Sequence, residues 1–427
     1  MADASKALNE IPLGVVLPAS EFAMRVWFEA VLTKFPQCRQ VYGGILSNVQ
    51  DLFSHCGRSP ALHASLSAVS LGMISRRVKQ DYLSAKALAS YGIALTAIQK
   101  AINDPQEAKS DETLLAILML SFYETLICAS RDPIAWASHV RGAATVIRLR
   151  GSAQLRDDQG LKLFQTFHDQ YLWSGLSGLG TDSDIPLVPE LCDEFQDFQE
   201  ENMPLNRIRG KSNKLLMLQT RLRNLELETL DTTAEAVSEI ATAINDLDEE
   251  LGEWTETVPD EWYCSVMPFE AETMKSDDIG TDHALIYSSI WVATFWNSYR
   301  SLRIFAGGLL ERCVRLHRTV DPAADDLIFE NKPSSKDLAE DICASVPFFL
   351  GYTGGNGERK FPYPQHIPQR PAYIVCAYQL MWPLYVAGSV QSLPLERRRW
   401  VARRLAYIGH SVGIKQAVAL SERVGVY

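Results

Sequence analysis

Apolar residues recur every three or four positions along most of the chain. One example is the stretch 80–103, in which the apolar residues are Leu83, Ala87, Tyr91, Leu95, Ile98 and Ile102. This spacing places side chains on one face of an α-helix, and Pro105 helps to end that helix. Runs in which apolar and polar residues alternate, as in β-strands, are not evident. The pattern predicts an all-α fold.

Two further helices are predicted after Pro105. Ser110 is a suitable N-cap, and Asp111 and Glu112 follow it in the first turn, where the helix dipole favours negative charge. The residues up to Tyr123 are apolar on nearly every side, so this helix is expected to be buried. A third amphipathic helix is expected over 136–150, and Gly151 ends it.

The stretch 214–254 predicts an antiparallel pair of helices. Their apolar positions are Leu215, Leu218, Leu222 and Leu225, then Val237, Ile240, Ile244, Leu247, Leu251 and Trp254. Thr232 and Glu235 have the spacing of a capping box that starts the second helix. Packing against the core is the favoured interpretation, because each run is shorter than a coiled coil requires. A seam with a partner or a second copy is the alternative.

Two stretches, 258–281 and 351–369, look irregular, and long loops inside compact domains are often functional. The most apolar segments, 114–122 and 372–387, are too short to span a bilayer, so no membrane contact is expected. The N-terminus carries no basic start followed by an apolar stretch. We therefore expect an intracellular protein of the nucleus or cytoplasm.

The charge balance argues against a large nucleic-acid surface. The 427 residues are 47% hydrophobic and 22% charged, and the formal net charge is −11. Phosphate binding needs clustered Lys and Arg. The two basic groups are Arg76, Arg77 and Lys79, and Arg397, Arg398, Arg399, Arg403 and Arg404. We interpret both as solvated or acid-paired helix faces, and direct nucleic-acid binding is not expected.

Cysteine spacing predicts no zinc cluster within these 427 residues. The nearest two of the eight cysteines, Cys38 and Cys56, are 18 positions apart, whereas zinc clusters use Cys-x-x-Cys pairs. Leu205 stands where a phosphate-binding loop ending at 210–212 requires its first glycine, and Leu179 stands where a nucleophile elbow requires its last. We expect no metal and no cofactor.

Six segments are similar to one known family. They are 110–116, 136–144, 299–304, 342–351, 380–389 and 396–405. In this order and spacing they resemble the fungal-specific transcription factor domain, the helical regulatory domain of fungal zinc-cluster regulators. The resemblance covers about residues 15 to 425. It implies a tail over 1–14 and one all-helical domain over 15–427 that senses effectors or controls activation.

The missing zinc cluster leaves three interpretations. The first is a stand-alone regulatory protein of fungal specialised metabolism that binds a small-molecule metabolite or a protein partner. The second is a cofactor-free cyclase or isomerase that acts on a natural-product intermediate in a pocket of the same fold, since a fold does not fix a function. The third is a truncated gene product. The sequence leaves a homodimer open.

Aromatic residues with polar tips mark the expected ligand cavity. The ligand-binding candidates are Trp291, Trp296, Tyr299, Arg300, Tyr378, Trp382 and Tyr385. The alternative is that these rings only fill the core. For proton transfer the candidates are His283 with Tyr287, expected on one face of a helix over 282–305, and His139, since imidazole titrates near neutrality. The family-like segment around His139 favours a structural role for it.

Overall fold

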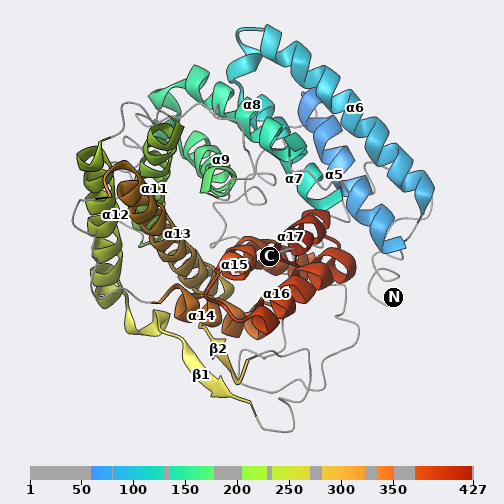
Figure 1. Cartoon of the computed structure of the whole chain (residues 1–427). Coiled ribbons are helices and arrows are strands. Elements are labelled where there is room, and N and C mark those ends of the chain that lie inside the picture. Colours follow the sequence, from blue (N-terminus) through green and yellow to red (C-terminus); the bar gives the residue numbers. More distant parts are fainter. Residues whose placement is uncertain are drawn as a thin grey trace. The chain divides into compact units, whose positions relative to one another are not determined.

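The computed structural model describes residues 59–78, 80–127, 134–176, 204–227, 233–269, 281–322, 334–350 and 371–425. Helices make up nearly all of this part of the chain (Figure 1), which confirms the all-α prediction. The contacts divide the chain into two compact units. Unit 1 is 1–170 with 184–186 and 370–372, and unit 2 is the remainder. Each unit is described by itself.

Unit 1 is built around the buried helix α7. Its elements are α5 (Pro60–Val78), α6 (Asp81–Asn103), η3 (Glu107–Lys109), α7 (Asp111–Ile127), α8 (Ile134–Arg150), η4 (Ser152–Arg156) and the first part of α9 (Asp158–Leu176). Every residue of α7 from Thr113 to Leu126 is buried, and α5 and α8 pack against it. The predicted burial of this helix is confirmed.

The predicted ends of two helices in unit 1 are also confirmed. The Ser110 hydroxyl accepts a hydrogen bond from the Thr113 amide at 3.1 Å, which caps α7. Gly151 has φ +67°, in the left-handed region that favours glycine, and it ends α8.

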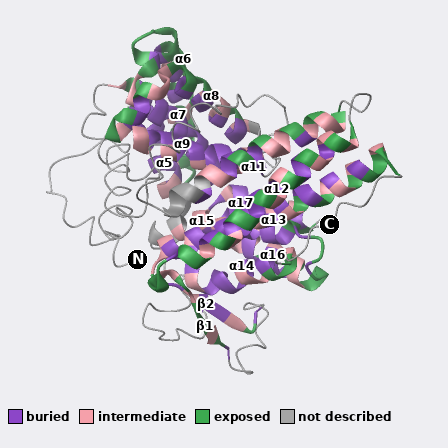
Figure 2. Cartoon of the chain, turned by 90° about the vertical axis from the view of Figure 1, so that its left-hand side faces the viewer, coloured by how far each residue is buried: buried purple, intermediate pink, exposed green. Residues whose placement is uncertain are grey.

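Helix α6 departs from the predicted pattern. Of the apolar stripe, Ala87 and Ile98 are buried, while Leu95 and Ile102 are each 42% exposed. The buried face instead combines Ile98 with three alanines spaced by seven, at 87, 94 and 101, whose small side chains let α5 pack closely against α6. Figure 2 shows the outer side of α6 as largely exposed.

Unit 2 contains the longest helix of the described chain, α13 (Ile290–Val320), which packs against α11, α12 and α14. The other elements are α11 (Pro204–Leu227), α12 (Ala234–Trp254), η5 (Thr255–Thr257), η6 (Asp260–Trp262), β1 (Ser265–Pro268), β2 (His283–Ile286), α14 (Ser335–Phe349), α15 (Pro371–Ser389), α16 (Leu395–Tyr407), the π-helical turn η8 (Ile408–Val412) and α17 (Lys415–Gly425). The predicted helical pair is α11 and α12, which contact each other.

Three details of unit 2 correct the prediction. The N-cap of α12 is Thr233, whose hydroxyl accepts from the Ala236 amide at 3.1 Å, and Thr232 lies outside the described residues. Strands β1 and β2 form an antiparallel pair with Val266 opposite Leu285, where a loop and the start of a helix were expected. Ser289 is extended and caps α13 through the Val292 amide at 3.2 Å, so the helix begins only at Ile290.

Among the described residues, no helix is both long enough and apolar enough to cross a membrane.

A glycine substitution tests the packing of unit 1. A Cβ atom on Gly160, in the first turn of α9, would lie 2.3 Å from the main-chain oxygen of Gln154, which cannot rotate away. Gly160→Ala is expected to lower the free energy of unfolding by about 1–3 kcal/mol. Gly308→Ala in α13 is the control, because a Cβ there meets no atom within 4 Å, and it should raise stability by about 0.5–1 kcal/mol. Urea denaturation of both variants measures the difference, and equal effects would contradict the described contact.

Candidate functional site

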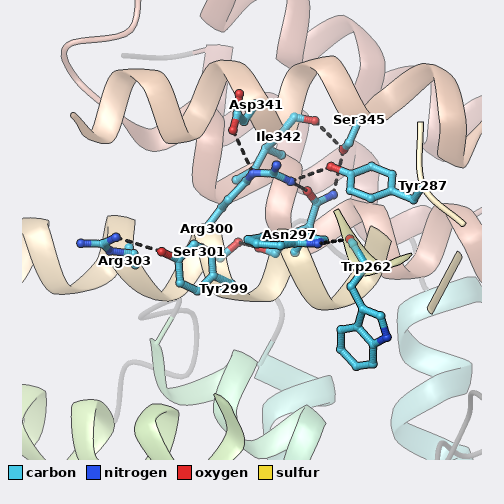
Figure 3. Close-up of polar contacts among 11 residues, drawn as sticks. Trp262, Tyr287, Asn297, Tyr299, Arg300, Ser301, Arg303, Asp341, Ile342 and Ser345 are labelled. Carbon is cyan, nitrogen blue, oxygen red and sulfur yellow. Dashed lines mark hydrogen bonds and ion pairs between the residues drawn. The ribbon is translucent and has the colours of Figure 1, made fainter. Parts of the chain in front are cut away.

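A buried polar network centres on Arg300 of α13. The side chain of Arg300 is 6% exposed, and its Nε donates to Asp341 Oδ2 of α14 at 3.2 Å. Its Nη1 donates to the Tyr287 hydroxyl at 2.7 Å and to Asn297 Oδ1 at 3.2 Å. Figure 3 shows these groups converging on the guanidinium from α13, α14 and the segment after β2. A single cation therefore joins three elements of unit 2.

Neutral groups extend this network into the core. Asn297 Nδ2 donates to Ser345 Oγ at 2.8 Å, and Ser345 Oγ donates to the Ile342 carbonyl at 2.7 Å. Ser301 Oγ donates to the Asn297 carbonyl at 2.7 Å. All four residues are buried, so these bonds satisfy groups that water does not reach.

The electrostatics keep Arg300 charged and Tyr287 neutral. Burial alone would lower the pKa of Arg300, but Tyr287 and Asp341 raise it above its ordinary value. Burial raises the pKa of Tyr287 to about 12, although Arg300 opposes the shift. The site therefore holds a permanent positive charge beside a neutral phenol.

Aromatic rings surround Phe295 on another side of α13. The Phe295 centroid lies 4.7 Å from that of Trp254 and 5.0 Å from that of Trp262. Trp262 packs edge-on against Trp291 at 4.3 Å, and the Trp296 indole donates to the Trp262 carbonyl at 2.7 Å. We call these five residues the Phe295 cluster. Phe295 and Trp296 are buried, whereas Trp291 and Trp262 remain partly accessible.

An ion pair lies beside this cluster. Arg303 Nε and Nη2 donate to the two carboxylate oxygens of Asp248 of α12, at 2.8 and 2.9 Å. Arg303 Nη1 donates to the Tyr299 hydroxyl at 2.9 Å (Figure 3). Tyr299 packs edge-on against Trp296 at 5.5 Å. Three predicted residues, Trp296, Tyr299 and Arg300, are thus close together on α13, and each already has protein partners.

The three remaining ligand candidates lie on α15. Trp382 is 3% exposed and stacks on Trp173 of α9 with centroids 5.9 Å apart and planes 9° apart. Tyr385 packs edge-on against Trp382 at 6.3 Å. Tyr378 and Tyr385 are half-buried, as is Trp173. Trp173 was not a candidate, since no pattern in the sequence relates it to α15.

The predicted pairing of His283 with Tyr287 on one helical face is wrong. His283 lies in β2, and its Nδ1 is 2.6 Å from Asp282 Oδ1. That hydrogen bond lowers the pKa of Asp282. Tyr287 lies beyond the strand, and its hydroxyl accepts from Arg300. The helix that would have aligned them begins only at Ile290.

His139 of α8 lies in unit 1, where its Nε2 is 3.0 Å from the Tyr91 hydroxyl of α6. Tyr91 stacks on Tyr123 of α7 at 4.9 Å. Burial lowers the pKa of His139, and the nearby Glu124 of α7 opposes this shift. His139 therefore joins three helices of unit 1 and favours its neutral form.

The lowered pKa of His139 predicts a pH dependence of stability. As the pH falls below the ordinary value of 6.5, the unfolded chain takes up the proton before the folded chain does. The free energy of unfolding should therefore decrease from pH 6.5 down to the folded pKa, by about 1.4 kcal/mol for each unit of the shift. Urea denaturation at pH 7.5 and 5.5 measures this loss. His139→Gln should reduce the loss of stability between the two pH values, whereas the control His410→Gln, at an exposed histidine, should not. An unchanged loss in the His139→Gln chain would contradict the prediction.

The basic residues of α16 fit the interpretation of a helix face that is solvated or paired with acidic groups. Arg397 Nε lies 2.8 Å from Glu340 Oε2 of α14, and Arg404 is buried over the rings of Trp400 and Tyr407. Arg399 and Arg403 are exposed. The side chains of the other group, Arg76, Arg77 and Lys79, lie outside the described residues. In the part of the chain that is described, no group of three or more His, Cys, Asp or Glu side chains could hold a metal ion.

Comparison with known proteins supports the resemblance. Residues 47–179 match the family described as Fungal specific transcription factor domain. The chain is also similar to "Transcription factor dbaG" of Emericella nidulans, with 23% identity over 422 residues that cover 97% of this chain and 93% of the relative. No solved structure matches. The similarity to fungal transcription factors inferred from the sequence is confirmed.

Proposed function

We propose that this chain is a transcription-factor-like regulatory protein of fungal specialised metabolism. It acts through a small effector or a protein partner rather than through DNA contacts of its own. The observation that carries the proposal is the similarity to a transcription factor over 97% of the chain. No Cys-x-x-Cys pair occurs in the 427 residues, which supports the proposal that the chain does not contact DNA through a zinc cluster of its own.

The effector would meet the partly accessible rings of unit 2. These rings are Trp291 and Trp262 of the Phe295 cluster, Trp173 and Tyr385, which pack against the buried Trp382, and the half-buried Tyr378 of α15. Flat rings with hydroxyl or indole N–H groups suit an aromatic or terpenoid metabolite. The fully buried Arg300 would support such a site by fixing α13 against α14 rather than by contacting the ligand.

Gene deletion followed by transcript profiling tests the regulatory function. Loss of the protein should change the transcript levels of a set of biosynthetic genes, and the wild-type chain should restore them. A Tyr385→Ala chain should restore the transcript levels less completely, because the substitution removes one of the accessible aromatic rings. Val266→Ser, at an exposed position of β1, is the matched control and should restore them fully. Unchanged transcripts in the deletion strain would refute the regulatory function.

The cyclase or isomerase alternative has a separate test. Its proposed acid–base pair is divided, because His283 is bound to Asp282 and Tyr287 to Arg300. Incubation of the purified protein with a metabolite extract, followed by liquid chromatography and mass spectrometry, should therefore show no conversion. A new product that His283→Ala abolishes would favour the enzyme instead.

A further inference from the structure

Helix α6 carries an unusual concentration of exposed apolar residues. Five of the eleven exposed large hydrophobic residues of the described chain lie on this one helix, and they are between 42% and 64% exposed. They are Tyr82, Leu88, Ile93, Leu95 and Ile102. Single exposed apolar residues are ordinary, but contiguous ones mark contact sites.

The polar residues that normally cover an outer helix face are scarce on α6. Its 23 residues include three charges, Asp81, Lys86 and Lys100. The inner face is occupied by α5, and to a smaller extent by α7 and η3. A helix that meets only solvent on its outer side normally carries a charged or polar surface there. The composition of this face is that of a packed helix.

The centre of the outer face permits close helix packing. Ala85, Ala89, Gly92 and Thr96 follow one another at spacings of four, three and four, and all are exposed. A Cβ on Gly92 would meet no atom within 4 Å. The Thr96 hydroxyl donates to the Gly92 carbonyl at 3.1 Å, so covering this residue would leave no unsatisfied hydroxyl. Small central residues with larger flanking ones let two helix axes approach closely.

We propose that α6 of a second copy of this chain packs antiparallel on this face. The large residues are arranged about Gly92, with Tyr82 ten positions before it and Ile102 ten positions after it. A two-fold axis at Gly92 would bring Tyr82 of each copy level, along the helix axes, with Ile102 of the other. A two-fold interface requires such a self-complementary surface.

The charges support the same arrangement. Antiparallel pairing brings the start of one α6, with Asp81, close to the end of the other, where Lys100 lies within about one turn along the axis. Two lysines and one aspartate give little attraction for an extended acidic partner. This surface is independent of the proposed regulatory function and of the hairpin α11–α12, for which a seam was the alternative interpretation.

The expected dimer is weak. A helix of 23 residues is about 34 Å long. One helix pair buries less than the roughly 1,600 Å² of a standard interface. We therefore expect reversible association with a Kd on the order of micromolar.

Sedimentation equilibrium of the full chain over a wide concentration range tests the proposal. A monomer–dimer equilibrium is expected, and the double substitution Leu88→Glu with Leu95→Glu should raise Kd at least tenfold. Leu149→Glu, at an exposed leucine of α8 in the same unit, is the matched control and should leave Kd unchanged. A chain that stays monomeric, or a dimer that the double substitution does not weaken, would overturn the proposal.

Cysteine cross-linking tests the antiparallel geometry. Under mild oxidation, Gly92→Cys should form a disulfide dimer, because the two copies meet near the axis, where Cα atoms come within reach of a disulfide. Gln99→Cys should not, because its two copies would be about 21 Å apart along the helices. The wild-type chain with its eight cysteines is run beside both. Dimer formation by Gln99→Cys and not by Gly92→Cys would refute this pairing. A loss of monomer stability in the chain with Leu88→Glu and Leu95→Glu would also refute it, because it would show that the chain covers its own α6.

Discussion

Asp248→Ala is expected to lower the free energy of unfolding by about 3–5 kcal/mol. The side chains of Asp248 and Arg303 are 5% and 10% exposed, and two hydrogen bonds of 2.8 and 2.9 Å join them. Removing the carboxylate leaves a guanidinium buried without its counter-charge. Chemical denaturation followed by tryptophan fluorescence measures the loss, since Trp254 and Trp296 lie in the same unit.

Glu239→Ala is the matched control on the same helix. Glu239 pairs with Arg221 at 3.0 Å, but the two side chains are 60% and 55% exposed, so the expected loss is about 0–1 kcal/mol. The double substitution Asp248→Leu with Arg303→Met should recover most of the stability, because two apolar side chains then pack where the ion pair was. Equal losses for Asp248→Ala and Glu239→Ala would contradict the burial of the Asp248–Arg303 pair.

Phe295→Ala is expected to lower the free energy of unfolding by about 3–5 kcal/mol. Phe295 is fully buried, and its ring contacts those of Trp254, Trp262, Trp291 and Trp296. The cavity would remove packing from most of the Phe295 cluster. Denaturation by urea gives the loss of stability, and a changed emission spectrum of the native state reports the rearranged indoles.

Two variants separate packing from other effects. Phe295→Leu keeps much of the volume and should cost about 1–2 kcal/mol. Tyr263→Ala, at a half-exposed ring whose hydroxyl donates to the Thr255 carbonyl at 2.8 Å, should cost about 1 kcal/mol. A Phe295→Ala chain as stable as Tyr263→Ala would show that Phe295 is not the centre of the cluster.

The candidate site was only partly predictable from the sequence. Trp296, Tyr299 and Arg300 could be assigned to one region because they follow one another on a helix. Asp341, the partner of Arg300, and Trp254, which packs against Tyr299, could not, because they lie 41 and 45 positions away in the sequence. The same holds for Asp248, which pairs with the neighbouring Arg303 from 55 positions away. The error at His283 arose because residues 282–305 were taken as one helix, although His283 lies in strand β2 and the helix begins at Ile290, after its N-cap Ser289.

The sequence by itself determined the helical class, the burial of α7, the caps at Ser110 and Gly151 and the pairing of α11 with α12. Each depends on the spacing of residues within about 40 positions, which local backbone preferences and the 3.6-residue period decide. Only the tertiary structure decided which apolar faces are covered. Leu95 and Ile102 have the spacing of core residues, yet alanines at 87, 94 and 101 meet α5 instead. Burial depends on which helix packs against which, and the periodicity of one helix does not contain that information.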